Sequence, residues 1–181
     1  MESFTNRTFD EIRVGETLTV SHRLSPMEVE ALALVSGDLD PFHVVAAAPE
    51  ANGTHAKSVA GEAFLSGMLC RRLPGPGTTI LEQNLHFKGE MGASDELVGT
   101  ITAREKRDED HVIVFDCAVR CADRELVGGS VTVSAPTSRV SYTDLATPDI
   151  LVRRNDAFTR LLQRCERLPP VTCAIVHPCD R

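Results

Sequence analysis

The chain has 181 residues, of which 42% are hydrophobic and 25% charged, and its formal net charge is -7 at pH 7. This length and composition are typical of one soluble globular domain with some residues left over. The acidic balance excludes a surface built to bind nucleic acid or anionic lipid, because either needs clustered Lys and Arg, and no apolar run approaches the roughly 20 residues of a membrane span.

The N-terminal residues lack the basic and apolar regions of a signal peptide, so we expect a cytoplasmic protein. A turn at Gly15 follows. The alternation of Leu18, Val20 and His22 with polar neighbours then predicts a strand over residues 17–24.

A helix is predicted over residues 26–35. Ser25 is its cap, Pro26 its first residue, and Glu28 lies three positions after the cap. Four residues are expected to form its buried stripe: Met27, Ala31, Leu34 and Val35. Gly37 ends this helix.

A second helix is predicted over residues 61–72, and the turn Leu-Pro-Gly-Pro-Gly at residues 73–77 ends it. Four strand-like runs follow, at residues 79–87, 97–103, 111–119 and 126–133. The third run is apolar on both faces, so we expect it to lie centrally. The pattern predicts an α+β domain, with an antiparallel sheet of about five strands wrapped around one long helix.

Apolar side chains are expected on one face of these strands. The first strand would place Leu81, Leu85 and Phe87 on one face, the second Leu97, Ile101 and Ala103, and the fourth Val127, Val131 and Val133.

After residue 137 the strand-like alternation stops and the sequence becomes polar and turn-rich. We therefore divide the chain into a domain at 1–137, a linker at 138–152 and a short unit at 153–181. The unit combines an amphipathic helix with an apolar strand at residues 171–176, which resembles the opening of a parallel α/β sheet. One helix and one strand cannot form a core, so this unit is either a second domain cut short or a tail that docks on the first domain.

The six cysteines are scattered and include no CxxC pair. This spacing favours reduced, structural cysteines over a zinc site. We expect no metal.

The segment Ser-Gly-Asp-Leu-Asp-Pro-Phe-His at residues 36–43 places Asp38 and His43 five positions apart on a loop stiffened by Pro41. One such group can give a proton while the other takes it, which is what hydration chemistry requires. The alternative to an active-site loop is an ordinary structural turn, because this composition is common in turns. His22 and His86 are expected to be exposed or satisfied strand histidines, and His55 could approach the pocket from a polar loop.

Three stretches make the sequence resemble the MaoC-like dehydratases, the R-specific enoyl-CoA hydratases of the hotdog fold. Residues 36–43 are close to that family's D-x-N-P-x-H signature. The turn at 73–78 runs into Gln-Asn-Leu-His-Phe at 83–87, and the opening at 9–15 leads to a helix that ends in Ser-Gly-Asp. Together these matches span roughly residues 8–135 in the family's order.

This resemblance implies a hotdog-fold homodimer that reversibly hydrates a trans-2-enoyl-CoA to an (R)-3-hydroxyacyl-CoA. Asp38 and His43 would be the catalytic pair that activates water, with Asp40 and Pro41 beside the substrate. The CoA thioester is the substrate, and no metal or redox cofactor is implied.

Two departures from the family pattern stand out. Asp40 replaces the usual Asn, which puts a second carboxylate near Asp38. The usual His-Gly-Met at the start of the central helix is absent, and residues 58–63 read Ser-Val-Ala-Gly-Glu-Ala instead. Gly61 is our candidate for the substrate-binding amide that stabilises the developing enolate oxygen.

Other hypotheses remain open on the sequence. Residues 158–180 resemble the start of a phosphate acetyl- or butyryltransferase domain, so the chain could be the N-terminal part of a bifunctional protein. The main domain could be a non-catalytic acyl-CoA-binding or oligomerisation module. It could also be a hotdog thioesterase, for which Glu62 is the acid that qualifies.

Overall fold

The predicted α+β architecture is confirmed in the computed structural model, which describes residues 3–25, 28, 31–32, 35, 59–88 and 96–143. The elements in chain order are β1 (Ser3–Thr5), the 3₁₀ turn η1 (Phe9–Glu11), β2 (Thr17–Arg23), α3 (Val59–Arg71), β3 (Thr79–Phe87), β4 (Glu96–Arg107), β5 (Val112–Cys121), β6 (Arg124–Ser134) and β7 (Ser141–Thr143).

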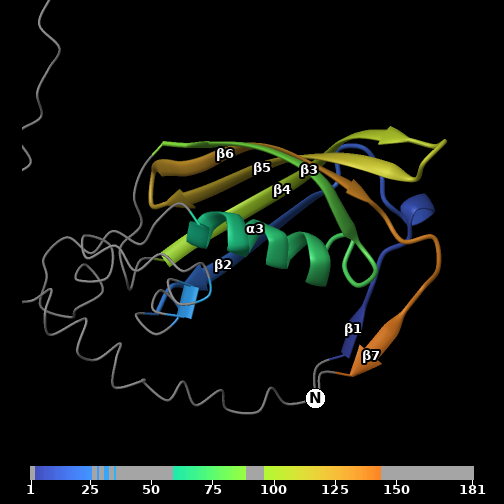
Figure 1. Ribbon diagram of the computed structural model, residues 1–181, viewed down its shortest axis with the longest axis horizontal. Coiled ribbons are helices and arrows are strands. Elements are labelled where there is room, and N and C mark those ends of the chain that lie inside the picture. The colour runs from blue at the N-terminus through green and yellow to red at the C-terminus, as the bar shows by residue number, and fades with distance from the viewer. Residues whose placement is uncertain are drawn as a thin grey trace, which may run out of the picture.

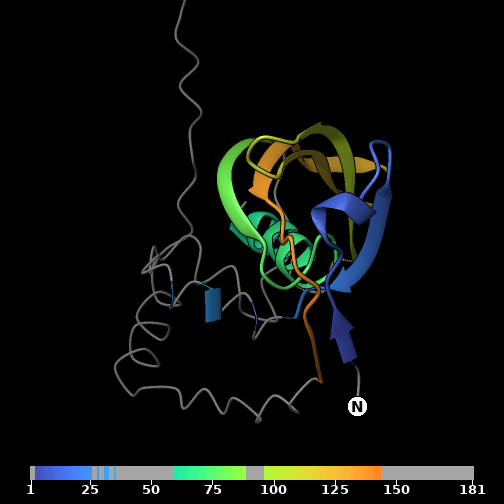
Figure 2. The same cartoon turned by 90° about the vertical axis from the view of Figure 1, so that its right-hand side faces the viewer.

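Five strands form one antiparallel sheet in the order β2-β4-β5-β6-β3. The sheet curves around α3 and covers it on three sides (Figure 1, Figure 2). β5 lies in the middle of the sheet, as its apolar run predicts, and Val112 to Phe115 are buried on both of its faces. This is the hotdog arrangement of one helix wrapped by a sheet.

The core lies between α3 and the concave face of the sheet. Leu65 and Leu69 of α3 are at most 1% exposed and belong to one cluster with Ile101, Phe115 and Val131 of the sheet. Each such side chain contributes about 1.5–3 kcal/mol by leaving water. The expected inward faces of β4 and β6 are confirmed, because all six of their named apolar residues are 0% exposed.

The expected face of β3 is wrong at Leu81. Leu81 is 54% exposed and Phe87 47% exposed, whereas Ile80 and Leu85 pack against the core. The pairing of β3 with β6 shifts register between Ile80 and Glu82. One extra residue at this irregularity puts Leu81 on the face opposite to that of Leu85. Phe87 lies two residues after Leu85, on the same face, and is exposed at the end of the strand.

The predicted start of the helix after β2 is confirmed. Glu28, Ala31, Leu32 and Val35 are helical, and the Glu28 backbone N–H donates to Ser25 Oγ at 3.3 Å. Val35 is 89% exposed, which corrects its place in the buried stripe, and Leu32 packs against the core instead.

The described positions of this helix line a cavity, so the apolar side chains among them are only partly covered. Of the other residues expected in its stripe, Met27 and Leu34 lie outside the described residues.

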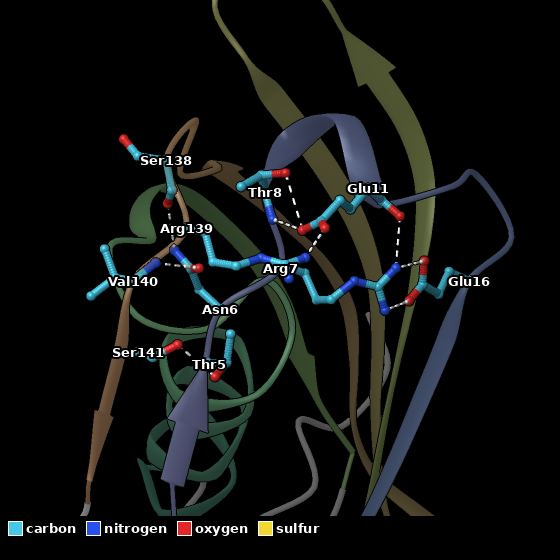
Figure 3. A network of polar contacts seen from close by, with 10 residues as sticks. All are labelled: Thr5, Asn6, Arg7, Thr8, Glu11, Glu16, Ser138, Arg139, Val140 and Ser141. Atoms are coloured by element: carbon cyan, nitrogen blue, oxygen red, sulfur yellow. Dashed lines mark hydrogen bonds and ion pairs between the residues drawn. The ribbon is translucent and has the colours of Figure 1, made fainter.

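A second, two-stranded sheet joins β1 to β7, so residues 141–143 of the expected linker pair with the N-terminal strand. Asn6 fixes this junction and is 1% exposed (Figure 3). Its amide nitrogen donates to the carbonyl oxygens of Pro76 at 3.0 Å and Ser138 at 2.9 Å, and its Oδ1 accepts the Val140 N–H at 2.8 Å.

Charged side chains brace the same region. Arg7 pairs with Glu16 at 2.9 Å, and Arg139 pairs with Glu11 (Figure 3). The unit expected at residues 153–181, with its acyltransferase resemblance, lies outside the described residues and stays a prediction. No helix in the described part of the chain is long and apolar enough to cross a membrane.

Candidate active site

A cavity of about 590 Å³ lies beside α3, on the side where β2 and the helix after it approach. Its walls come from β2, from the helical positions 28, 31, 32 and 35, and from one face of α3. A volume of about 300–1,000 Å³ is usual for small-molecule sites. Most of the lining is apolar, so the cavity is suited to a ligand with an apolar portion.

Three small residues contribute to the α3 wall of the cavity. Ala60, Ala63 and Gly67 are spaced at i, i+3 and i+7 on one face of the helix, beside Phe64 and Met68. A β-carbon on Gly67 would meet no atom within 4 Å, so open space lies directly over that position. The face from residue 60 to residue 71 is about 16 Å long at 1.5 Å per residue.

Polar groups enter the cavity from β2 and the helix after it. His22 Nε2 lies 3.0 Å from Glu28 Oε1, and the His22 ring lies 5.7 Å from that of Phe64. Burial alone would raise the pKa of Glu28, but hydrogen bonds from Ser25 and the nearby His22 together lower it below its usual value. Glu28 is therefore a carboxylate at neutral pH.

The C-terminal end of α3 adds two cations to the cavity wall, Arg71 and Arg72. Their guanidinium carbons lie 5.0 Å and 5.3 Å from the ring centroid of the buried Phe4. Stacking on this aromatic face holds both guanidinium groups beside Phe4, which is not itself part of the cavity wall.

Gly61 lies in the first turn of α3 and is buried. Its backbone N–H is one of the four at a helix start that have no partner within the helix. Ala60, beside it, lines the cavity, whereas neither Gly61 nor Glu62 is part of the wall.

The other predicted site residues, Asp38, Asp40, Pro41 and His43, lie outside the described residues. Val35, which lines the cavity, precedes Asp38 by three residues, so their Cα atoms are at most about 11 Å apart at 3.8 Å per step.

Sequence reasoning missed the cavity wall on α3 and the two arginines that end it. The small residues at i, i+3 and i+7 were the available signal, but that spacing is equally typical of helix packing.

His22 is paired with Glu28 and His86 is exposed, as expected for strand histidines. His55 lies outside the described residues. Within the described ranges, no cluster of three or more His, Cys, Asp or Glu could hold a metal ion.

Comparisons with known proteins place this site in context. No established family profile matches the sequence. The (R)-specific enoyl-CoA hydratase of Aeromonas caviae is 30% identical over 101 residues, which cover 54% of this chain and 75% of that protein. The (R)-specific enoyl-CoA hydratase of Rhodospirillum rubrum is 27% identical over 131 residues, covering 71% of this chain and 91% of that protein.

Solved structures of (R)-specific hydratases are also similar to this chain. The unliganded R-hydratase PhaJ1 of Pseudomonas aeruginosa superposes with a TM-score of 0.74 at 25% identity, covering 82% of this chain and 98% of that one. The (R)-hydratase of A. caviae superposes with a TM-score of 0.63 at 26% identity, covering 69% of this chain and 98% of that one.

Proposed function

Since this chain belongs to the MaoC-like family of (R)-specific enoyl-CoA hydratases, we propose that it reversibly hydrates a trans-2-enoyl-CoA to an (R)-3-hydroxyacyl-CoA. Water adds across the double bond, so that its oxygen bonds to C3 and a proton bonds to C2. The observation that carries the proposal is the cavity, because its wall includes Val35, three residues before Asp38.

Asp38 and His43 are the proposed catalytic pair. A histidine near its ordinary pKa of about 6.5 can accept the proton of water at neutral pH, while the carboxylate of Asp38 orients that water. One member of the pair then returns a proton to C2. Such acid–base assistance contributes about 10²- to 10⁴-fold in rate.

The thioester oxygen gains negative charge as water adds, and the first turn of α3 supports the proposal that an amide there stabilises it. The helix begins at Val59, so the N–H groups of its first four residues, including Gly61, point away from the helix body at its positive end. We assign the amide to Gly61, which follows the cavity-lining Ala60, and we keep Asp40 and Pro41 as proposed substrate contacts.

The apolar wall of α3 is the proposed site of the acyl chain. The thioester lies at the first turn of α3, and the acyl chain extends along Ala63 and Gly67, where a β-carbon on Gly67 would meet no atom within 4 Å. Binding then buries the apolar surface of the acyl chain against the apolar groups of this wall.

The proposed functional unit is a homodimer. β2 and β3 are the edge strands of the described sheet, and β3 exposes Leu81 and Phe87. An edge strand that carries large exposed apolar side chains is an interaction surface. The double substitution Leu81→Lys and Phe87→Lys should shift the mass measured by light scattering from dimer to monomer.

Crotonyl-CoA hydration, followed by the loss of enoyl absorbance, tests the enzymatic proposal. The wild type should be active, and Asp38→Asn and His43→Gln should each lose about 10²-fold or more in kcat. Asp123→Asn, in the exposed β5–β6 turn, is the matched control and should retain full activity. Chiral analysis should show the (R)-alcohol. An inactive but folded wild type, or an Asp38→Asn variant with full activity, would overturn the proposal.

A further inference from the structure

His22 joins three elements that are separate in the sequence. It lies on the edge strand β2, opposite Leu97 of β4. Its Nε2 contacts Glu28 Oε1, in the first turn of the next helix, at 3.0 Å, and its ring lies 5.7 Å from the Phe64 ring of α3 with an angle of 36° between the planes. One imidazole therefore contacts both helices that line the cavity.

The Glu28 carboxylate has two roles at once. Its Oε2 accepts hydrogen bonds from the Ser25 backbone N–H at 2.8 Å and from the Ser25 hydroxyl at 2.6 Å, which completes the capping box. Its Oε1 is left for His22. The Glu28 carboxylate therefore both caps the start of the helix and connects the helix to His22 of the sheet.

Phe64, the third member, has little freedom of its own. A β-carbon on Gly99 of β4 would lie 2.8 Å from Phe64 Cε1, so the ring rests directly on the sheet backbone. His22 therefore binds the start of the helix to a surface that is already fixed by close packing.

We propose that His22 is a positioning residue for the hydration reaction, because it fixes the start of the helix of Glu28, and the same helix places Val35, three residues before Asp38 in the sequence, in the cavity wall. This inference rests on the proposed function. The side chains of His22 and Glu28 are 40% and 45% exposed, and ion pairs so exposed contribute little to folding stability. The role of His22 is geometric, so its loss affects turnover more than stability.

Two substitutions separate the contacts that His22 makes. His22→Phe keeps an aromatic ring against Phe64 but removes the donor to Glu28, whereas His22→Gln keeps a donor. Arg23→Gln is the matched control, since Arg23 is the neighbouring residue and pairs with Glu96 at 4.0 Å, outside the cavity wall.

Steady-state kinetics with crotonyl-CoA should show kcat about tenfold lower in His22→Phe, because small misplacements of reacting groups are costly in rate. KM should change by less than about twofold, and His22→Gln should recover most of the lost rate. Arg23→Gln should match the wild type. The inference is overturned by an unchanged kcat in His22→Phe, or by an equal loss in Arg23→Gln.

Hydrogen exchange separates this inference from the proposed function. The backbone amides of Glu28, Ala31 and Leu32 should exchange faster in His22→Phe, at unchanged global stability. If the wild type hydrates no enoyl-CoA, the proposed function fails, and exchange still shows whether His22 anchors the helix. Unchanged exchange at these amides would refute the anchoring itself.

Discussion

Gly99 of β4 lies directly beneath Phe64 of α3, at a distance that leaves no room for a side chain. A β-carbon at position 99 would stand 2.8 Å from Phe64 Cε1 and 2.5 Å from Met68 Sδ. Both side chains also line the cavity, so the same close approach that packs the helix on the sheet shapes the wall of the site.

Gly99→Ala is expected to destabilise the protein by about 1–3 kcal/mol, because the added methyl group overpacks the contact between α3 and β4. Gly67→Ala is the control, since a β-carbon there meets nothing within 4 Å. In a helix interior, Ala in place of Gly should raise stability by up to about 1 kcal/mol. Urea unfolding measures both changes, and equal stability of the two variants would contradict this account of the packing.

Replacing Asn6 should release the junction between the chain's N-terminal strand and β7. Asn6→Ala leaves the Val140 N–H and the carbonyl groups of Pro76 and Ser138 without their partner, at a cost of about 2–3 kcal/mol. Asn6→Asp keeps the acceptor for Val140 but loses both donors, so it should recover little of this stability. Thermal unfolding tests both variants, and a wild-type midpoint for Asn6→Asp would show that the donors contribute nothing.

Cys117 should resist alkylation in the folded protein. Burial, with a smaller effect from Asp116, raises the pKa of its thiol to about 12. The reactive thiolate is therefore scarce at pH 8. Cys70 and Cys121 are partly exposed and should react first with iodoacetamide, as peptide mass spectrometry would show. Labelling of Cys117 at the same rate would contradict its burial.

The raised pKa of Cys117 also has a consequence for stability. The unfolded chain ionises this thiol near its ordinary value of 9.0, and the folded chain only at about 12. The unfolded state therefore releases its proton first, so stability falls as pH rises from about 9 to about 12. Cys117→Ser should lack this part of the alkaline decline in unfolding curves measured across that range.

Glu28 should show the opposite dependence. Its folded pKa lies below the unfolded value of 4.5, because the hydrogen bonds from Ser25 and the charge of His22 outweigh the effect of burial. The stability it contributes is fully present above pH 4.5 and is lost as pH falls through the lower folded pKa. The stability difference between wild type and Glu28→Gln should therefore shrink as the pH falls below 4.5. A constant difference across this range would rule out the carboxylate as its source.

Much of the fold could be predicted from the sequence, because the hydrophobic period of each helix or strand is set by residues that are close together in the chain. The strand predicted at 79–87 has those bounds, and the helix predicted at 61–72 is observed at Val59–Arg71. The capping box at Ser25 is confirmed for the same reason, since its partners lie three residues apart.

The features that were missed depend on partners remote in the sequence. Nothing near Leu81 marks the register shift that turns it outward, because the shift belongs to the pairing of β3 with β6. The pairing of β1 with β7 joins two three-residue strands from opposite ends of the domain, too short to have a period. The roles of Asp38 and His43 stay predictions, because those residues lie outside the described ranges.

The open face of α3 predicts a dependence of activity on acyl-chain length. If the acyl chain extends along Gly67, then Gly67→Phe places a ring in the space the chain would occupy, while Gly67→Ala adds only one carbon. Each excluded methylene is worth about 1–3 kcal/mol in a fitted apolar pocket. Gly67→Phe should therefore lower kcat/KM for octenoyl-CoA by about tenfold or more relative to crotonyl-CoA.

Gly67→Ala should leave that ratio near its wild-type value, and both variants should unfold at or above the wild-type urea concentration, which excludes misfolding as the cause. An unchanged ratio in a folded Gly67→Phe would mean that the acyl chain lies elsewhere. A loss of activity equal for both substrates would instead place the thioester itself beside Gly67, about 1.7 turns further along α3 than the amide of Gly61.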